Sequence, residues 1–332
     1  MNTPILFRDS NRLKTFEARS KLGQLRFVLT GWIDVHRFQL CAKPFSLTRR
    51  IVSLAIVTGL AHCVVIGAPV SEQAIHQLAD DFFARRPSQA IAPQLTLEEG
   101  IEAQKQFVAA LVPRLGPVVG YKVGLVTKEA QERLGLSSPI RGKLLEKMVL
   151  PNSAKVSARF GVRPICEADL LVVVRDEGIH AARTPLEVAQ HLKELVAFIE
   201  LPDMVLATNP PVNGAMLTAA NVGARLGVIG QRRAFQPTPE FVEALAAMNV
   251  TITNQAGADL GRAKGNAILG QPLNAVLWLL RDLTISGEKL KPGDLLSLGS
   301  LKAVPVQAGQ KMTVTYEGLP GGPLAATVEF TD

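Results

Sequence analysis

The sequence predicts an α+β fold in which a helical N-terminal part precedes a mainly β body. Between residues 71 and 111, apolar residues recur at the three- and four-residue spacing of amphipathic helices. From about residue 160 the pattern changes to short apolar or alternating runs separated by turn residues, which is typical of strands. With 332 residues, 47% of them hydrophobic, the chain is long enough to bury a substantial core.

The first segment, residues 1–70, is a basic leader. It holds ten Lys or Arg and three Asp or Glu, whereas the other 262 residues hold 26 of each kind, so the net charge of +7 belongs to the leader. Arg49 and Arg50 precede an uncharged run over residues 51–68, a layout typical of an export signal or a membrane anchor. We therefore favour an exported, periplasmic protein that touches a membrane only through this segment, if it is uncleaved. The alternative is a buried helix in a cytoplasmic protein.

Composition excludes several classes of function. The body is electrically neutral and aromatic residues make up only 5% of the chain, so a nucleic-acid partner is not expected. Cys41, Cys63 and Cys166 are widely spaced and form no CxxC pair, which argues against a disulfide framework and a zinc cluster. No GxSxG or GxxxxGK[ST] motif occurs, so serine-based catalysis and a phosphate-binding loop are not supported.

The second segment, residues 71–160, begins with two predicted helices. Ser71 is suited to cap the first, whose apolar residues recur up to Phe82. Thr96 and Glu99 form a capping box that begins the second, and we expect Pro113 to end it.

The rest of this segment is predicted to contain one strand, one helix and one loop. The stretch "GPVVGYKVGL", residues 116–125, favours a strand whose glycines permit close backbone approach. Residues 127–136 favour a short helix, and residues 137–145 an ordered loop.

The third segment, residues 161–332, is the predicted β body. An apolar strand covers residues 164–174, and Thr184 with Glu187 then begins a helix expected to run to about Glu200. Further strands are expected at residues 221–230, 249–254, 294–300, 311–316 and 325–330, with one helix at 272–283.

Two acids interrupt the apolar strand "PICEADLLVVV". Glu167 and Asp169 are two positions apart, so they project from the same face of a strand, where buried carboxylates need protons, hydrogen bonds or a cation. Glu200 adds a third carboxylate in "FIELPD", and Lys122 lies between glycines in "GYKVG". Three carboxylates suit Mg²⁺ or Mn²⁺. The alternative is a buried carboxylate–lysine salt bridge with a solvated helix end.

These pieces and others resemble the fumarylacetoacetate hydrolase superfamily, and within it the branch of 2-keto-4-pentenoate hydratases and 4-oxalocrotonate decarboxylases. The matching pieces occur in the family's order over residues 72–330 and omit the leader. They are "GYKVGL", "QERLGLSSPIRGKLL", "CEADLLVVV", "AFIELPD", "NVGARLGVIG", "GQPLNAVLWL", "LKPGDLLSLGSL" and "VPVQAGQKMTVTYEGL".

The resemblance implies a β-roll that houses one divalent cation, Mg²⁺ or Mn²⁺. It also implies that the protein is a homo-oligomer. It implies a catalytic lysine and three metal ligands, and it places substrate contacts in two further motifs. The catalytic lysine would be Lys122, the ligands Glu167, Asp169 and Glu200, and the substrate contacts Asn221, Gly299 and Ser300. Arg141 would be suited to meet a second substrate carboxylate, although such an arginine is commonly solvated.

The activity implied is that of a metal-dependent lyase. A hydratase of this branch adds water to a 2-hydroxy-2,4-dienoate or its 2-oxo tautomer, as in aromatic meta-cleavage catabolism. A decarboxylase of a 2-oxo diacid is the alternative, because Ile140 stands where hydratases tend to have Asp. A binder of 2-oxo acids without turnover is a third reading, since Asp169 replaces the usual Glu and Asn221 lacks its flanking acid and hydroxyl.

A hydrolase that cleaves a C–C bond between two carbonyls is less favoured. Such an enzyme needs a base to activate water, commonly His. His76, His180 and His191 all lie far in sequence from the lysine and acidic segments.

Overall fold

A computed structural model describes residues 70–332. The predicted export signal and its cytoplasmic alternative both concern residues outside this range. Among the described helices, none has both the length and the apolarity needed to cross a membrane.

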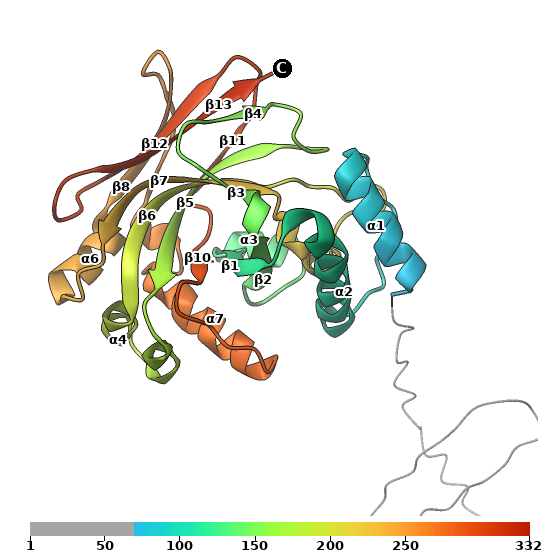
Figure 1. Cartoon of the computed structure of the whole chain (residues 1–332), viewed down its shortest axis with the longest axis horizontal. Coiled ribbons are helices and arrows are strands. Elements are labelled where there is room, and N and C mark those ends of the chain that lie inside the picture. Colours follow the sequence, from blue (N-terminus) through green and yellow to red (C-terminus); the bar gives the residue numbers. More distant parts are fainter. Residues whose placement is uncertain (1–69) are drawn as a thin grey trace, which may run out of the picture. The chain divides into compact units, whose positions relative to one another are not determined.

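The described residues form seven α-helices and thirteen strands, joined by short turns and 3-10 helices (Figure 1). The helices are α1 (Glu72–Ala84), α2 (Leu97–Leu115), α3 (Lys128–Arg133), α4 (Pro185–Gln190), α5 (Gly214–Ala219), α6 (Pro239–Ala247) and α7 (Leu273–Ile285). The strands are β1 (Val118–Gly124), β2 (Ile140–Leu145), β3 (Val149–Leu150), β4 (Ala154–Ser157), β5 (Ile165–Val174), β6 (Leu192–Leu201), β7 (Leu226–Ala234), β8 (Asn249–Asn254), β9 (Asp259–Lys264), β10 (Leu295–Ser297), β11 (Lys302–Pro305), β12 (Lys311–Glu317) and β13 (Leu324–Thr331).

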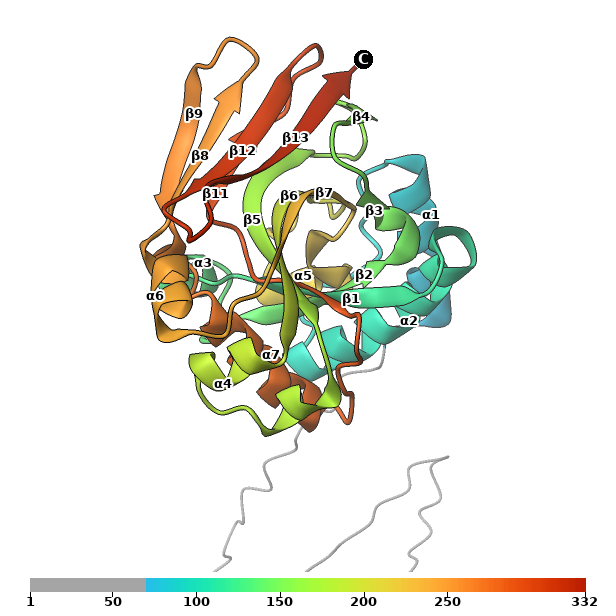
Figure 2. The ribbon, with the colours of Figure 1, turned by 60° about the vertical axis from the view of Figure 1, so that its left-hand side comes forward.

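The strands form two sheets. The larger has the order β2-β1-β10-β5-β6-β7-β3, with β11 paired to β5, and the smaller has the order β4-β13-β12-β8-β9. Figure 2 shows the smaller sheet above the larger one, with α7 and α4 below. This arrangement of N-terminal helices and a curled β body confirms the predicted α+β class.

Strand β5 separates two environments because its side chains alternate between its faces. Cys166, Ala168, Leu170 and Val172 enter the main apolar core, which includes residues of both sheets and of α4, α6 and α7. Glu167, Asp169, Leu171 and Val173 project from the opposite face, where a small apolar cluster includes Leu171 and Phe198. The two acids therefore share one face of β5, as the alternation predicts, and this face carries the smaller apolar cluster.

Strands β1 and β2 precede residue 160 but belong to the same sheet as β5 and β6. The predicted boundary between a helical part and a β body therefore lies within a continuous sheet. This matters for the site because Lys122 is on β1, in the first part, and the acids are on β5 and β6, in the second.

Four predicted elements differ from those observed. The strand expected at residues 221–230 begins only at Leu226, because residues 221–223 form a 3-10 turn. The helix that begins after Thr184 ends at Gln190, and Glu200 lies on strand β6, where β5 and β7 pair with both edges. The predicted loop at 137–145 contains β2, which pairs antiparallel with β1. Helix α2 continues through Pro113 to Leu115, because a proline near the C-terminal end removes only one backbone hydrogen bond.

A tyrosine joins the two sheets beside the acidic strand. The hydroxyl of Tyr316, on β12, is fully buried and contacts the main-chain carbonyl of Asp169, on β5, and that of Phe198, on β6, the latter at 2.8 Å. Buried carbonyls deprived of a donor destabilise a fold by about 1–3 kcal/mol.

We expect Tyr316→Phe to lower the free energy of unfolding by about 1–3 kcal/mol, because the ring still fills its space and only the buried donor is lost. Urea unfolding followed by fluorescence would measure it. Tyr121→Phe is the control, since its hydroxyl contacts the carboxylate of the partly exposed Glu288 at 3.3 Å, and Lys143 still binds that carboxylate when the hydroxyl is lost. An unchanged urea midpoint for Tyr316→Phe would contradict the prediction.

Candidate functional site

Lys122 and Glu200 meet although their strands are not neighbours. Strands β10 and β5 lie between β1 and β6, so a flat sheet would separate the two residues by about 14 Å, which is three strand spacings. Nevertheless Lys122 Nζ forms an ion pair with Glu200 Oε1. The larger sheet is therefore curled, with these side chains on its concave face, and its curvature is visible in Figure 2.

Lys122 is almost completely buried, with 4% of its surface exposed. Its Nζ donates to the main-chain oxygen of Val222 at 3.1 Å, in addition to its contact with Glu200. Burial alone would lower the pKa of Lys122, but the negative charges of Glu200 and Glu167 raise it above the usual lysine value. The ion pair with Glu200 therefore favours the charged ammonium form of Lys122.

Glu167 and Asp169 carry perturbed pKa values. Burial and repulsion from Glu200 raise the pKa of Glu167 to about 8, although Lys122 opposes the effect. The same two causes raise the pKa of Asp169 to about 7. Glu167 lies directly opposite Glu200 in the β5–β6 pairing, which explains the repulsion. If all three acids were ionised, the site would hold more negative charge than Lys122 alone can neutralise, and the raised pKa values express this excess.

Protein donors occupy both oxygens of Asp169, which is completely buried. Its Oδ2 accepts from the hydroxyl of Ser297 at 2.6 Å, and its Oδ1 accepts from the backbone N–H groups of Gly299 at 3.0 Å and Leu170. Ser300 donates to Glu167, which is half-buried. The two residues predicted as substrate contacts after β10, Gly299 and Ser300, thus hold the acidic pair in this structure.

The three carboxylates fit a divalent cation in charge and donor type. When all are ionised, they exceed the charge of Lys122 by two, and oxygen donors suit a hard cation. Within residues 70–332, however, no three His, Cys, Asp or Glu side chains are placed to hold a metal ion together. Glu200 faces Lys122 instead, and Oε1 has that amine as its sole polar partner among the described residues. The carboxylate–lysine salt bridge is thus present, but Glu200 ends no helix.

Asn221 lies in a 3-10 turn (Asn221–Gly223) that packs on the edge strand β2. Its Oδ1 accepts from the N–H of Lys143 at 2.7 Å, and its Nδ2 donates to the carbonyl of Lys143 at 2.9 Å. The resemblance implied that Asn221 contacts the substrate. In this structure both polar groups of its side chain bind the protein backbone.

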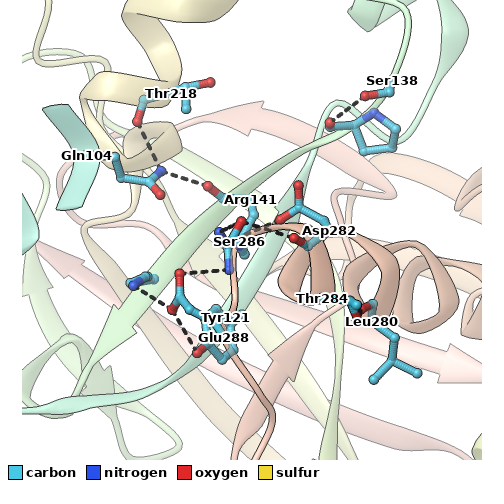
Figure 3. A network of polar contacts seen from close by, with 12 residues as sticks. Gln104, Tyr121, Ser138, Arg141, Thr218, Leu280, Asp282, Thr284, Ser286 and Glu288 are labelled. Carbon is cyan, nitrogen blue, oxygen red and sulfur yellow. Dashed lines mark hydrogen bonds and ion pairs between the residues drawn. The ribbon is translucent and has the colours of Figure 1, made fainter. Parts of the chain in front are cut away.

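Arg141 projects from the face of β2 opposite the site. In the pairing of β2 with β1, Gly142 is opposite Lys122, so Arg141, one position away, points to the other side. Figure 3 shows its guanidinium beside α7, where it contacts Asp282 at 2.9 Å and Glu288 at 3.2 Å. Two carboxylates already neutralise this arginine, so the predicted contact with a substrate carboxylate has no support here.

Sequence reasoning missed three participants in the site. Ser297 donates to Asp169, and the carbonyl of Val222 accepts from Lys122. Gly142 leaves room for the Lys122 side chain, since a Cβ atom at Gly142 would lie 2.8 Å from Lys122 Cγ. Ser297 lies within the motif "LLSLGS", which could have indicated it. A main-chain carbonyl leaves no signal of residue type.

Comparison with known proteins places the chain among lyases, although no protein-family model matches it. It is 30% identical over 203 residues to a 2-keto-4-pentenoate hydratase from Paraburkholderia phymatum, covering 61% of this chain and 75% of the relative. A 4-oxalocrotonate decarboxylase from Pseudomonas putida is 26% identical over 246 residues, covering 74% and 87%.

A solved structure has the same fold. The 4-oxalocrotonate decarboxylase from Pseudomonas putida G7, complexed with magnesium and adipate, matches 80% of this chain and 100% of its own with a TM-score of 0.67 and 21% identity. Given also its identity to the hydratase, the chain belongs to the 2-keto-4-pentenoate hydratase family, within the hydratase and decarboxylase branch of the fumarylacetoacetate hydrolase superfamily that its motifs resemble.

Proposed function

We propose that the protein is a hydratase that adds water to a 2-hydroxy-2,4-dienoate and forms a 4-hydroxy-2-oxo acid. The observation that carries this proposal is the buried Lys122, whose Nζ forms an ion pair with Glu200 beside Glu167 and Asp169. A buried ammonium beside carboxylates is suited to deliver a proton to a carbon atom of an anionic dienol. The relatives named as hydratases support the choice of reaction.

In this reaction Lys122 would hold and move the proton. Transfer of its Nζ proton to C5 of 2-hydroxypenta-2,4-dienoate, with loss of the enol proton, gives a 2-oxo-3-enoate, to whose C4 water then adds. Glu200 and the carbonyl of Val222 would orient the amine during these steps. Burial of the site excludes competing solvent and strengthens these charge interactions.

We further propose Mg²⁺ or Mn²⁺ as the cofactor, held by Glu167, Asp169 and Glu200. The excess negative charge of these side chains and the raised pKa values of Glu167 and Asp169 support a cation at this place. When bound, such an ion supplies Lewis-acid stabilisation of a 2-oxo acid. Structures of the matched decarboxylase with calcium or magnesium agree with a divalent ion without selecting one.

Decarboxylation of a 2-oxo diacid is the second candidate, and the relative that favours it matches more of this chain than the hydratase does. Against it stands Arg141, which faces away from Lys122 and is neutralised by Asp282 and Glu288. We therefore favour a substrate with one carboxylate. Export through the leader and the homo-oligomeric state both stay predictions.

The purified full chain should consume 2-hydroxypenta-2,4-dienoate in the presence of Mg²⁺ or Mn²⁺. Loss of the dienoate absorbance would give the rate, and NMR would identify the 4-hydroxy-2-oxo product. Release of CO₂ from a 2-oxo-3-enedioate, with no hydration of the monoacid, would replace the hydratase by the decarboxylase. Binding of either acid without turnover would support a binder instead.

A further inference from the structure

We infer that Asn221 is a positioning residue for Lys122, and this inference rests on the proposed role of Lys122 as the proton carrier. Asn221 is completely buried. Its side-chain amide pairs with the backbone of Lys143, on the outer edge of β2, in the way that a neighbouring strand would. Both polar groups of the side chain are thereby used, so Asn221 is not free to contact a substrate without breaking these bonds.

We call the pairing of the Asn221 side chain with the backbone of Lys143 the clamp, and its consequence concerns the next residue, Val222. The carbonyl of Val222 accepts a hydrogen bond from Lys122 Nζ at 3.1 Å. Glu200 holds the same amine from another strand. Lys122 is thus fixed between the carboxylate of Glu200 and the carbonyl of Val222, whose position depends on Asn221. The clamp therefore controls the direction of the ammonium N–H bonds.

The backbone of this turn is strained in a way that needs such a clamp. Asn221, Val222 and Gly223 have φ values of 55°, 55° and 67°, all in the left-handed region. Asparagine and glycine tolerate this region, but a β-branched valine rarely adopts it. Strained residues persist where the surrounding contacts fix them, commonly at functional sites. The strain at Val222 directs its carbonyl toward Lys122.

Gly142 provides a second, independent contact between the turn and the lysine. A Cβ atom at Gly142 would lie 2.8 Å from the main-chain oxygen of Asn221 and 2.8 Å from Lys122 Cγ. Only glycine therefore allows the turn and the lysine side chain to approach β2 this closely. An alanine here would displace either the turn or the lysine without removing any polar group.

The test compares Asn221→Ala with Asn213→Ala. Asn213 begins the same segment, and its side chain also makes two hydrogen bonds to main-chain atoms, to Met216 N and Pro93 O, away from Lys122. We expect both variants to lose similar thermal stability. Asn221→Ala should also lower kcat by about 10–100-fold with KM changed less than about 3-fold, because misplacement of a reacting group costs about this much. Asn213→Ala should keep kcat within about 3-fold.

A second measurement does not depend on turnover. Lysine acylation of the full chain, followed by peptide mass spectrometry, should modify Lys122 about 10-fold faster in Asn221→Ala than in the native protein, relative to the exposed Lys128 of the same sample. Gly142→Ala should give the same increase, which keeps the test valid if Asn221→Ala folds poorly. Asn213→Ala should leave the ratio unchanged.

Each outcome decides between roles. A rise in KM with unchanged kcat would make Asn221 a substrate contact, and unchanged labelling with unchanged kcat would leave it a purely structural residue; both overturn the inference. If the native protein turns over none of the acids but the labelling changes as expected, the positioning role stands and the proposed hydratase activity fails.

Discussion

Lys122→Met is expected to lower kcat by about 10³-fold or more on 2-hydroxypenta-2,4-dienoate while the protein remains folded. The reason is that methionine fills similar space but carries no proton, and a positioned acid or base contributes about 10²–10⁴-fold. The variant also frees Glu200, whose Oε1 pairs with the amine in the native protein. Mn²⁺ binding, measured by calorimetry, should therefore be retained or become tighter. Dienoate absorbance would give the rate.

The matched control is Lys143→Met, on the neighbouring strand β2. Lys143 projects from the face opposite Lys122, and its Nζ forms an ion pair with Glu288 at 2.7 Å. This variant should keep kcat within about 3-fold. Activity of Lys122→Met close to the native value would remove the lysine from the chemistry, and equal loss in both variants would point to a general disturbance of β1 and β2.

The acidic pair is the part of the site that sequence reasoning places best, because its geometry is local. Alternation along one strand fixes the common face of Glu167 and Asp169 wherever that strand pairs, and β5 spans both residues as expected. Lys122 on β1 is placed by the same argument. What the alternation cannot give is the distance between the two strands, which depends on the curl of the whole sheet.

The local sequence does not predict that Glu200 lies on a strand. The helix start at Thr184 is correct, since its hydroxyl accepts from the N–H of Glu187, but α4 ends at Gln190. Residues 192–201 then form β6, because pairing with β5 and β7 buries their apolar side chains on both faces. Such long-range pairing overrides helix propensity and leaves no mark in the local sequence.

Arg141 illustrates the same limit with a functional consequence. Interpreted as part of a loop, residues 137–145 leave the direction of its side chain open. Once β2 pairs with β1, the position of Gly142 opposite Lys122 forces Arg141 to the other face. The strand assignment thus determines which face of the sheet carries Arg141, beside Asp282 of α7 and Glu288 that follows this helix.

Glu167→Gln is expected to weaken Mn²⁺ binding by more than about 100-fold and to abolish most turnover. The physical reason is charge: the change removes one of the three carboxylates whose burial and mutual repulsion raise the pKa of Glu167 to about 8. A divalent cation relieves this repulsion, so its affinity depends on each acid. Even loss of an outer partner of a metal ligand costs about 10–100-fold in affinity, so loss of a ligand should exceed that.

The control is Glu194→Gln, on strand β6, where the carboxylate pairs with Arg232 at 3.0 Å, away from Lys122. It should bind Mn²⁺ like the native protein.

Treatment of the native protein with EDTA should likewise abolish turnover, and added Mg²⁺ or Mn²⁺ should restore it. Glu200 must exchange Lys122 for the cation, whereas Glu167 accepts its hydrogen bond from the neutral hydroxyl of Ser300. Native Mn²⁺ affinity in Glu167→Gln, or activity that survives EDTA, would therefore exclude a cation held by these acids. Lys122 would then interact with protein groups alone.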